Sequence, residues 1–249
     1  MIKGRTWWLG AVLLLLSTSA WAAKDKDKNK EAANQAVDSG SFGVFVNGQR
    51  IATETFDIQQ NSSGSTIKSQ FKTEGAAGNA IQTSELQLTP TGNLLRYEWK
   101  ELSPGKSGAE VTPDGEFLIG RYTESADSKP LAQPFLLPAS TSVLDDYFFV
   151  QREILVWKFL AMTCRQKDGK VECPEKHRTQ FGALNAHSRS SMSITVEFVG
   201  REKVTIRGAE REWNRLNLKS ENENWALWLD DQFKLMRILA ENNTEVVRD

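Results

Sequence analysis

The amino-acid sequence predicts an α+β fold, mainly antiparallel β, in which a strongly curved sheet or half-barrel wraps around one long central helix. Most of the chain consists of short segments in which apolar and polar residues alternate between Gly, Asn and Asp turns, as is typical of antiparallel strands. One segment, residues 142–162, is instead apolar at most positions. A helix that is apolar on most sides is expected to be enclosed by other elements.

Residues 1–22 have the pattern of a secretory signal peptide. Lys3 and Arg5 precede the apolar run Trp7–Leu16, and Ala20–Ala22 forms an A-x-A cleavage site. The alternative is an uncleaved anchor, but the run is short for a bilayer span. We therefore expect a periplasmic or secreted bacterial protein, cleaved near Ala22 and not membrane-spanning after cleavage.

Residues 23–40 begin with AKDKDKNKE and are expected to form a mobile charged linker. Residues 41–249 are then expected to form a single β-rich domain. The whole chain has a formal net charge of −1. This balance argues against a nucleic-acid partner, which requires a basic face.

Residues 41–124 are expected to form consecutive antiparallel strands. Phe42, Val44 and Val46 alternate with smaller or polar residues, and Asn47-Gly48 then gives a strong two-residue hairpin signal. Around residues 93–102, apolar and charged side chains alternate, which predicts a strand with one dry and one wet face.

Residues 125–140 are rich in proline, with Pro130, Pro134 and Pro138. Proline interrupts regular structure, so this segment is expected to lead the chain from the sheet to the helix. Its apolar residues 135–137 fit either an ordinary crossover loop or a lid over one opening.

The central helix is expected over residues 142–162. Ser142 and Asp145 have the spacing of a capping box, and acidic residues in the first turn favour the positive end of the helix dipole. Charged residues within the segment argue against a membrane span: they are Asp145, Asp146, Arg152, Glu153 and Lys158.

Cys164 and Cys173 follow this helix and are the only two cysteines of the chain. In an exported protein such a pair predicts a disulfide. A redox or metal pair is the alternative, but the spacing is not C-x-x-C and His177 is the only imidazole nearby. Beyond residue 190 alternating strands return, and residues 225–238 form an aromatic-rich ribbon suited to closing a curved sheet.

The sequence contains no motif that specifies a reaction. Its two histidines cannot form a multi-His metal site, and no G-x-S-x-G or G-x-G-x-x-G motif occurs. The carboxylate pairs at 145–146 and 230–231 fit a helix start and a turn. We therefore predict no catalytic residue, no cofactor and no metal, and a non-enzymatic role, with hydrolase activity as the last alternative.

Five aromatic residues are candidates for a ligand-binding site. A strongly curved sheet is difficult to fill with one helix, which would leave an apolar cavity. The other interpretation is that these rings simply fill the core. The candidates are Trp99, Phe148, Phe149, Trp157 and Trp228.

The order of elements resembles that of exported half-barrel proteins. A signal peptide is followed by a hairpin at Gly43–Gly48, a crossing helix and closing strands. This resembles lipoprotein carriers of the LolA/LolB type and related exported bacterial families, although no residue is matched individually and the helix here lies in mid-chain. The resemblance implies an acyl chain or a lipid-modified protein as partner.

Two functions follow as hypotheses. The first is the binding of a hydrophobic ligand or lipid-modified partner in a curved sheet. The alternative is a structural or assembly factor of the cell envelope with a solid core. An apolar space of several hundred Å³ would favour the first.

Overall fold

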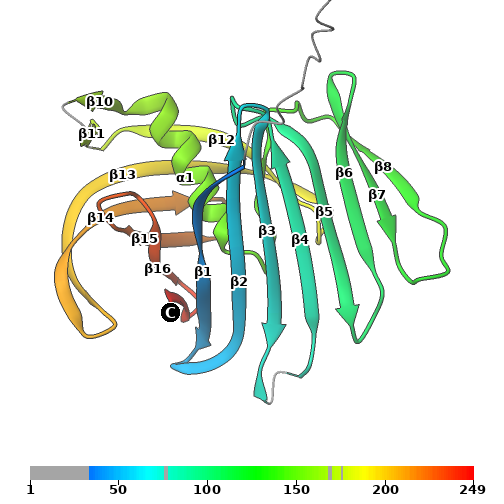
Figure 1. The fold of residues 1–249 in the computed structure, drawn as a ribbon, viewed down its shortest axis with the longest axis horizontal. Coiled ribbons are helices and arrows are strands. Elements are labelled where there is room, and N and C mark those ends of the chain that lie inside the picture. The colour runs from blue at the N-terminus through cyan, green and yellow to red at the C-terminus, as the bar shows by residue number, and fades with distance from the viewer. Residues whose placement is uncertain (1–33, 76–77, 168–169, 175) are drawn as a thin grey trace, which may run out of the picture. The chain divides into compact units, whose positions relative to one another are not determined.

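The computed structural model describes residues 34–75, 78–167, 170–174 and 176–249. In these residues, a 15-stranded sheet is accompanied by one helix and a separate two-stranded hairpin (Figure 1). The sheet is open, because its edge strands β8 and β9 do not pair with each other. Neighbouring strands are antiparallel except β9 and β12. The predicted α+β class with a mainly antiparallel sheet is confirmed.

The first eight strands lie side by side in chain order, with each strand hydrogen-bonded to the next. Alternating burial along them matches the alternating sequence, as in β3 and β4. The strands are β1 (Gln35–Val46), β2 (Gln49–Asn61), β3 (Gly64–Thr73), β4 (Ile81–Leu88), β5 (Leu94–Ser103), β6 (Gly108–Asp114), β7 (Phe117–Thr123) and β8 (Leu131–Phe135).

The Asn47-Gly48 hairpin is confirmed. Both residues have positive φ, 49° and 79°, which a two-residue hairpin turn of this type requires and which Asn and Gly tolerate best. The proline-rich segment contains β8, an edge strand that pairs only with β7. Pro134 fits an edge position because a proline cannot donate to a ladder.

The remaining strands continue the same sheet on the other side of β1. The last strand, β17, pairs with β1, placing Val246 opposite Val44. In Figure 1, β13 and β14 run across the direction of β1–β4. These strands and the short ones near the helix are β9 (Ser142–Val143), β10 (Arg165–Lys167), β11 (Lys170–Glu172), β12 (Arg178–Asn185), β13 (Ser190–Ile206), β14 (Ala209–Lys219), β15 (Asn224–Leu229), β16 (Leu235–Ala240) and β17 (Thr244–Arg248).

The helix α1 is shorter than the sequence predicted and spans Val150–Thr163. Residues Ser142 and Val143 form β9, so the predicted capping box is wrong. No side chain of the preceding segment caps the helix; the carboxylate of Glu54 on β2 accepts the backbone N–H groups of Phe149 and Val150 instead. The first turn is therefore positioned by a residue distant in sequence.

Seven of the 14 residues of α1 are buried, and three of these are polar or charged. Its buried residues are Val150, Gln151, Arg152, Glu153, Leu155, Val156 and Phe159. Glu153 accepts the backbone N–H of Leu235 on β16, and the Trp157 indole donates to the carbonyl of Phe233. Both halves of the sheet thus contact α1. No helix in the described part of the chain combines the length and apolarity that a membrane crossing requires.

The predicted signal peptide, residues 1–22, lies outside the described residues, as do residues 23–33 of the predicted linker. The end of that linker is corrected by the structure, because β1 begins at Gln35 and pairs with Gln60 of β2. Pairing with a neighbouring strand orders a polar segment whose composition alone suggests mobility.

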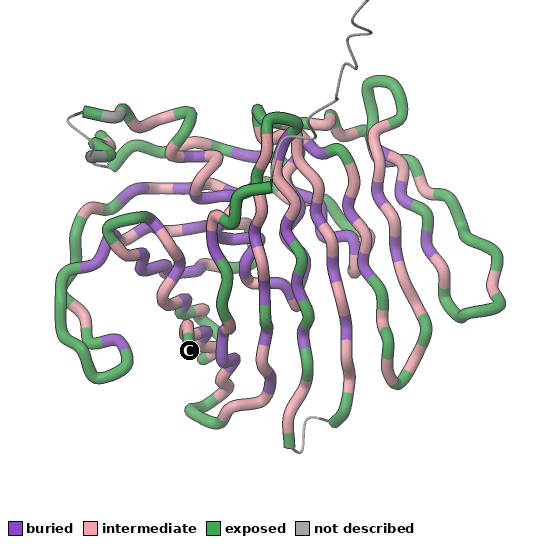
Figure 2. Tube along the Cα trace, viewed as in Figure 1, coloured by how far each residue is buried: buried purple, intermediate pink, exposed green. Residues whose placement is uncertain are grey.

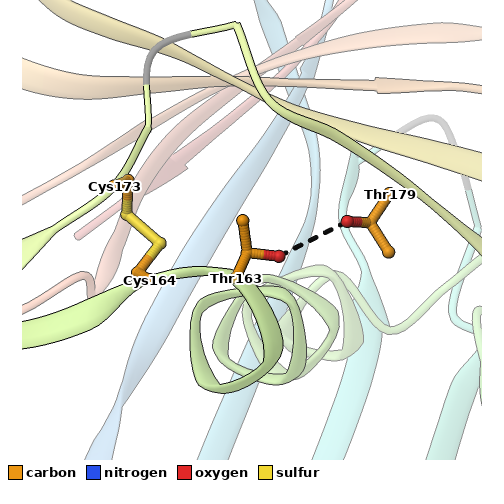
Figure 3. Close-up of a disulfide and its surroundings, with 4 residues drawn as sticks. All are labelled: Thr163, Cys164, Cys173 and Thr179. Atoms are coloured by element: carbon orange, nitrogen blue, oxygen red, sulfur yellow. Dashed lines mark hydrogen bonds between the residues drawn. A yellow bond between two sulfur atoms is a disulfide. The ribbon is translucent and has the colours of Figure 1, made fainter.

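The disulfide between Cys164 and Cys173 is confirmed, and it joins the end of α1 to the segment before β12 (Figure 3). Beside it, the hydroxyls of Thr163 and Thr179 lie 3.3 Å apart. Burial is concentrated in the middle of the strands, while hairpin ends are exposed (Figure 2). The main core combines residues of α1 with one face of the sheet.

Candidate functional site

A cavity of about 440 Å³ lies between α1 and strands β2–β4. This volume is within the range of about 300–1,000 Å³ that is usual for small-molecule sites. Most of its lining is apolar, and its apolar side chains include Ile58, Leu86, Leu88, Ile154, Leu155 and Trp157. The cavity is therefore suited to an apolar guest.

Two local patterns create this lining. On the helix, Ile154, Trp157, Lys158 and Ala161 follow the spacing i, i+3, i+4, i+7, which places them on one face. On the sheet, Ile58 of β2 and Leu86 of β4 are both in register with Ile67 of β3, so their side chains share a face.

The cavity extends along α1 from a buried to an exposed end. Gln151 is 1% exposed, whereas Met162 is 66% exposed. The turn at residues 89–92 between β4 and β5 completes the lining. At 1.5 Å per residue, the helix from 151 to 162 is about 16 Å long. The lining therefore runs from the buried first turn of α1 to the exposed end of the helix.

Two polar side chains of α1, Gln151 and Lys158, line the cavity beside polar residues of the sheet and turn. The Gln151 carbonyl oxygen accepts the backbone N–H of Asp145 at 2.6 Å, while its amide nitrogen has no hydrogen-bond partner among the described residues. The Lys158 ammonium donates to the carbonyl of Ser140 at 2.6 Å. Burial lowers the pKa of Lys158.

A buried polar network surrounds the start of α1. Glu54 is fully buried and accepts hydrogen bonds from Ser69 at 2.6 Å and from the Phe149 amide at 2.7 Å. Burial raises the pKa of Glu54 to about 7, although those hydrogen bonds oppose the shift. Tyr97 donates to the carboxylate of Asp145 at 2.7 Å, and burial likewise raises the pKa of Asp145.

These raised pKa values resemble those of acid–base catalysts, but the geometry favours a structural role. Glu54 and Asp145 are both 0% exposed, and neither lines the cavity. A catalytic acid must reach a substrate within hydrogen-bond distance. The network instead fixes the segment that leads into α1, because each carboxylate accepts backbone N–H groups there.

A second charged cluster holds the other side of α1. Burial by itself would raise the pKa of Asp38, but hydrogen bonds from Arg248 and Lys234 lower it overall. Nearby, burial and the charge of Asp38 raise the pKa of Glu153 well above its usual value. The cluster links β1, β17 and α1 with Lys234, which directly precedes β16.

The structure places the five predicted aromatic residues in different environments. Trp157 lines the cavity, while Trp99 donates to Gln82 and its ring lies edge-on to His187. Phe148 is completely buried and Phe149 half-buried just before α1. Trp228 packs with Ile206 and Trp213 in a separate cluster. Of the five, the cavity includes Trp157 alone.

Lys158, Ile58, Leu86 and Ile154 line the cavity but are not among the site residues predicted from the sequence. The helical spacing of Ile154, Trp157 and Lys158 was a usable signal for the helix side. The strand residues carried no comparable signal, because alternation marks them as buried without saying what covers them.

Within the described residues, no group of three or more His, Cys, Asp or Glu side chains is arranged to hold a metal ion. The resemblance to LolA/LolB-type carriers stays a prediction. Comparisons of the chain with protein-family models, with curated proteins and with solved structures find no match.

Proposed function

We propose that this chain is an exported, non-enzymatic protein that binds a hydrophobic ligand between α1 and strands β2–β4. The observation that carries the proposal is the elongated, mainly apolar cavity of about 440 Å³. Apolar surface shielded from water supplies binding energy in proportion to its area. The ligand class is an acyl chain, free or attached to a lipid-modified protein.

In this proposal the sheet acts as a curved half-barrel around α1. Contacts from β2 and β16 to the same helix support it, because they hold α1 from two separate parts of the sheet. The disulfide supports export, since disulfides persist in oxidising compartments such as the periplasm. The disulfide also fixes the C-terminal end of α1, which adjoins the exposed end of the cavity.

The test is a search for bound lipid followed by a binding titration. The full chain is exported in a bacterial host, purified without detergent and examined by native mass spectrometry. A fluorescent fatty acid is then titrated into delipidated protein. We expect co-purifying lipid and saturable binding. Absence of both would overturn the proposal.

Two variants test whether the ligand binds in this cavity. Ala161 is exposed at the cavity end, so Ala161→Trp should obstruct the opening with little effect on the core. We expect at least tenfold weaker binding of the probe, because an indole occupies the space of the guest. Ala132→Trp, at an exposed position on β8, is the matched control and should bind normally. Equal binding by both variants would place the guest elsewhere.

The second candidate is an assembly factor of the cell envelope. It is favoured by exposed apolar residues beside the open edge strand β8, where Leu131 is 59% and Leu136 81% exposed. Such side chains at a sheet edge can form a protein contact. Replacing both leucines with serine should then abolish complementation of a deletion strain while lipid binding is unchanged. Normal complementation would exclude this candidate.

A further inference from the structure

The cavity is lined by one charged side chain, which is a cation. Lys158 is its one ionisable side chain, and neither Asp nor Glu contributes to it. Four other hollows in the described part of the chain each contain at least two carboxylates. The cavity therefore differs from these hollows, because its lining contains a cation and no carboxylate.

Lys158 lacks an ionic partner among the described residues. Its ammonium donates to the Ser140 carbonyl, which leaves further N–H donors for another acceptor. Burial is the one cause that lowers its pKa, and no nearby carboxylate counteracts it. A half-buried ammonium gains from an anion beside it, because the pair offsets part of the desolvation cost.

The buried end of the cavity disfavours an anion. Gln151 is hydrogen-bonded to the backbone of Asp145, and the buried carboxyl groups of Asp145 and Glu54 lie around the start of α1. The buried Arg152 lies among Glu54, Asp145 and Asp146 and does not line the cavity, so an anion at this end would lose its hydration without gaining an ion pair. The charge distribution along α1 thus gives the cavity a direction, with its cationic group two helical turns from Gln151.

We propose that the ligand is a single-chain fatty acid whose carboxylate binds Lys158 and whose alkyl chain lies along α1 toward Gln151. This inference rests on the proposed function and narrows its ligand class. The carboxylate satisfies the unpaired cation, and the alkyl chain covers Ile154, Leu86 and Ile58. A neutral ester of the same length would fill the apolar space without pairing with Lys158.

The experiment compares decanoate with its methyl ester in displacement of a fluorescent fatty-acid probe, below the micellar range. Wild-type protein should bind the carboxylate at least tenfold more tightly, because a charge-assisted hydrogen bond is worth that factor or more. Lys158→Met should remove the difference by weakening carboxylate binding alone. Lys158→Arg should retain the preference.

Lys72→Met is the matched control, because Lys72 is exposed on β3 and does not line the cavity. It should behave as wild type. Equal binding of acid and ester by the wild-type protein overturns the assignment of Lys158 while leaving the proposed function intact. Failure of both ligands to bind overturns the proposed function. The wild-type comparison decides even if Lys158→Met does not fold.

Discussion

At the scale of single residues, Glu54 connects the start of α1 to the sheet. It lies 95 positions before Phe149 in the chain, yet its carboxylate takes the place of a local N-cap for α1. It also accepts the hydroxyl of Ser69 on the neighbouring strand β3. One buried side chain thus attaches α1 to the sheet, which in turn sets the position of the helix face that lines the cavity.

Replacing Glu54 should destabilise the protein through unpaired donors. In Glu54→Ala the amides of Phe149 and Val150 and the Ser69 hydroxyl lose their acceptor, and we expect a loss of about 2–4 kcal/mol in the free energy of unfolding. Glu54→Gln keeps one acceptor oxygen and should lose less. Urea denaturation of the three proteins measures this.

Asp57→Asn is the control for Glu54→Gln, because Asp57 lies on the same strand but is half-exposed and accepts one side-chain hydrogen bond, from Gln59. Its free energy of unfolding should change by less than about 0.5 kcal/mol. If Glu54→Ala were no less stable than Asp57→Asn, the capping role of Glu54 would be wrong.

At the scale of elements, the sequence predicted the helix but not its start. The apolar run from residue 150 onward predicts a helix, and α1 is found there. The residues before it resemble a helix start, yet Val143 pairs with Leu184 of β12 and Asp146 accepts a hydrogen bond from Asn185. These long-range partners outweigh local capping preference, and no local pattern reveals them.

The disulfide is predicted to stabilise the end of α1. Cys164 and Cys173 are nine positions apart, and closing so short a loop stabilises by about 2–3 kcal/mol in the chain-entropy model. The double variant Cys164→Ser/Cys173→Ser should lose about this amount in urea denaturation. Reductant should destabilise the wild type equally and leave the double variant unaffected. A reductant effect on the double variant would contradict this account.

At the scale of the whole molecule, hairpin turns could be predicted from the sequence, but the pairing of strands that are distant in the chain could not. Asn47-Gly48 marks its own turn, but nothing in β1 or β17 indicates that Val44 will lie opposite Val246. The cavity has the same origin, since it exists only once α1 is placed over β2–β4. Trp157 was predicted from its aromatic character, whereas Lys158 became a site residue only through this placement.

The raised pKa values of the buried carboxyl groups predict that the protein is most stable at mildly acidic pH. Folded Glu54 releases its proton near pH 7, whereas in the unfolded chain it does so near pH 4.5. The folded state therefore binds more protons between these values, and stability must fall as the pH rises through them. The raised pKa values of Asp145 and Glu153 act in the same direction.

Below about pH 4 the free energy of unfolding should instead fall as the pH is lowered. Hydrogen bonds from Arg248 and Lys234 lower the pKa of Asp38, and stability is lost as this group is protonated. We therefore expect the free energy of unfolding to be about 2 kcal/mol higher at pH 5.5 than at pH 8 from Glu54 alone. Urea denaturation across this range tests it, and Glu54→Gln should show a flatter dependence. Greater stability of the wild type at pH 8 would show that Glu54 is ionised at little cost in the folded state.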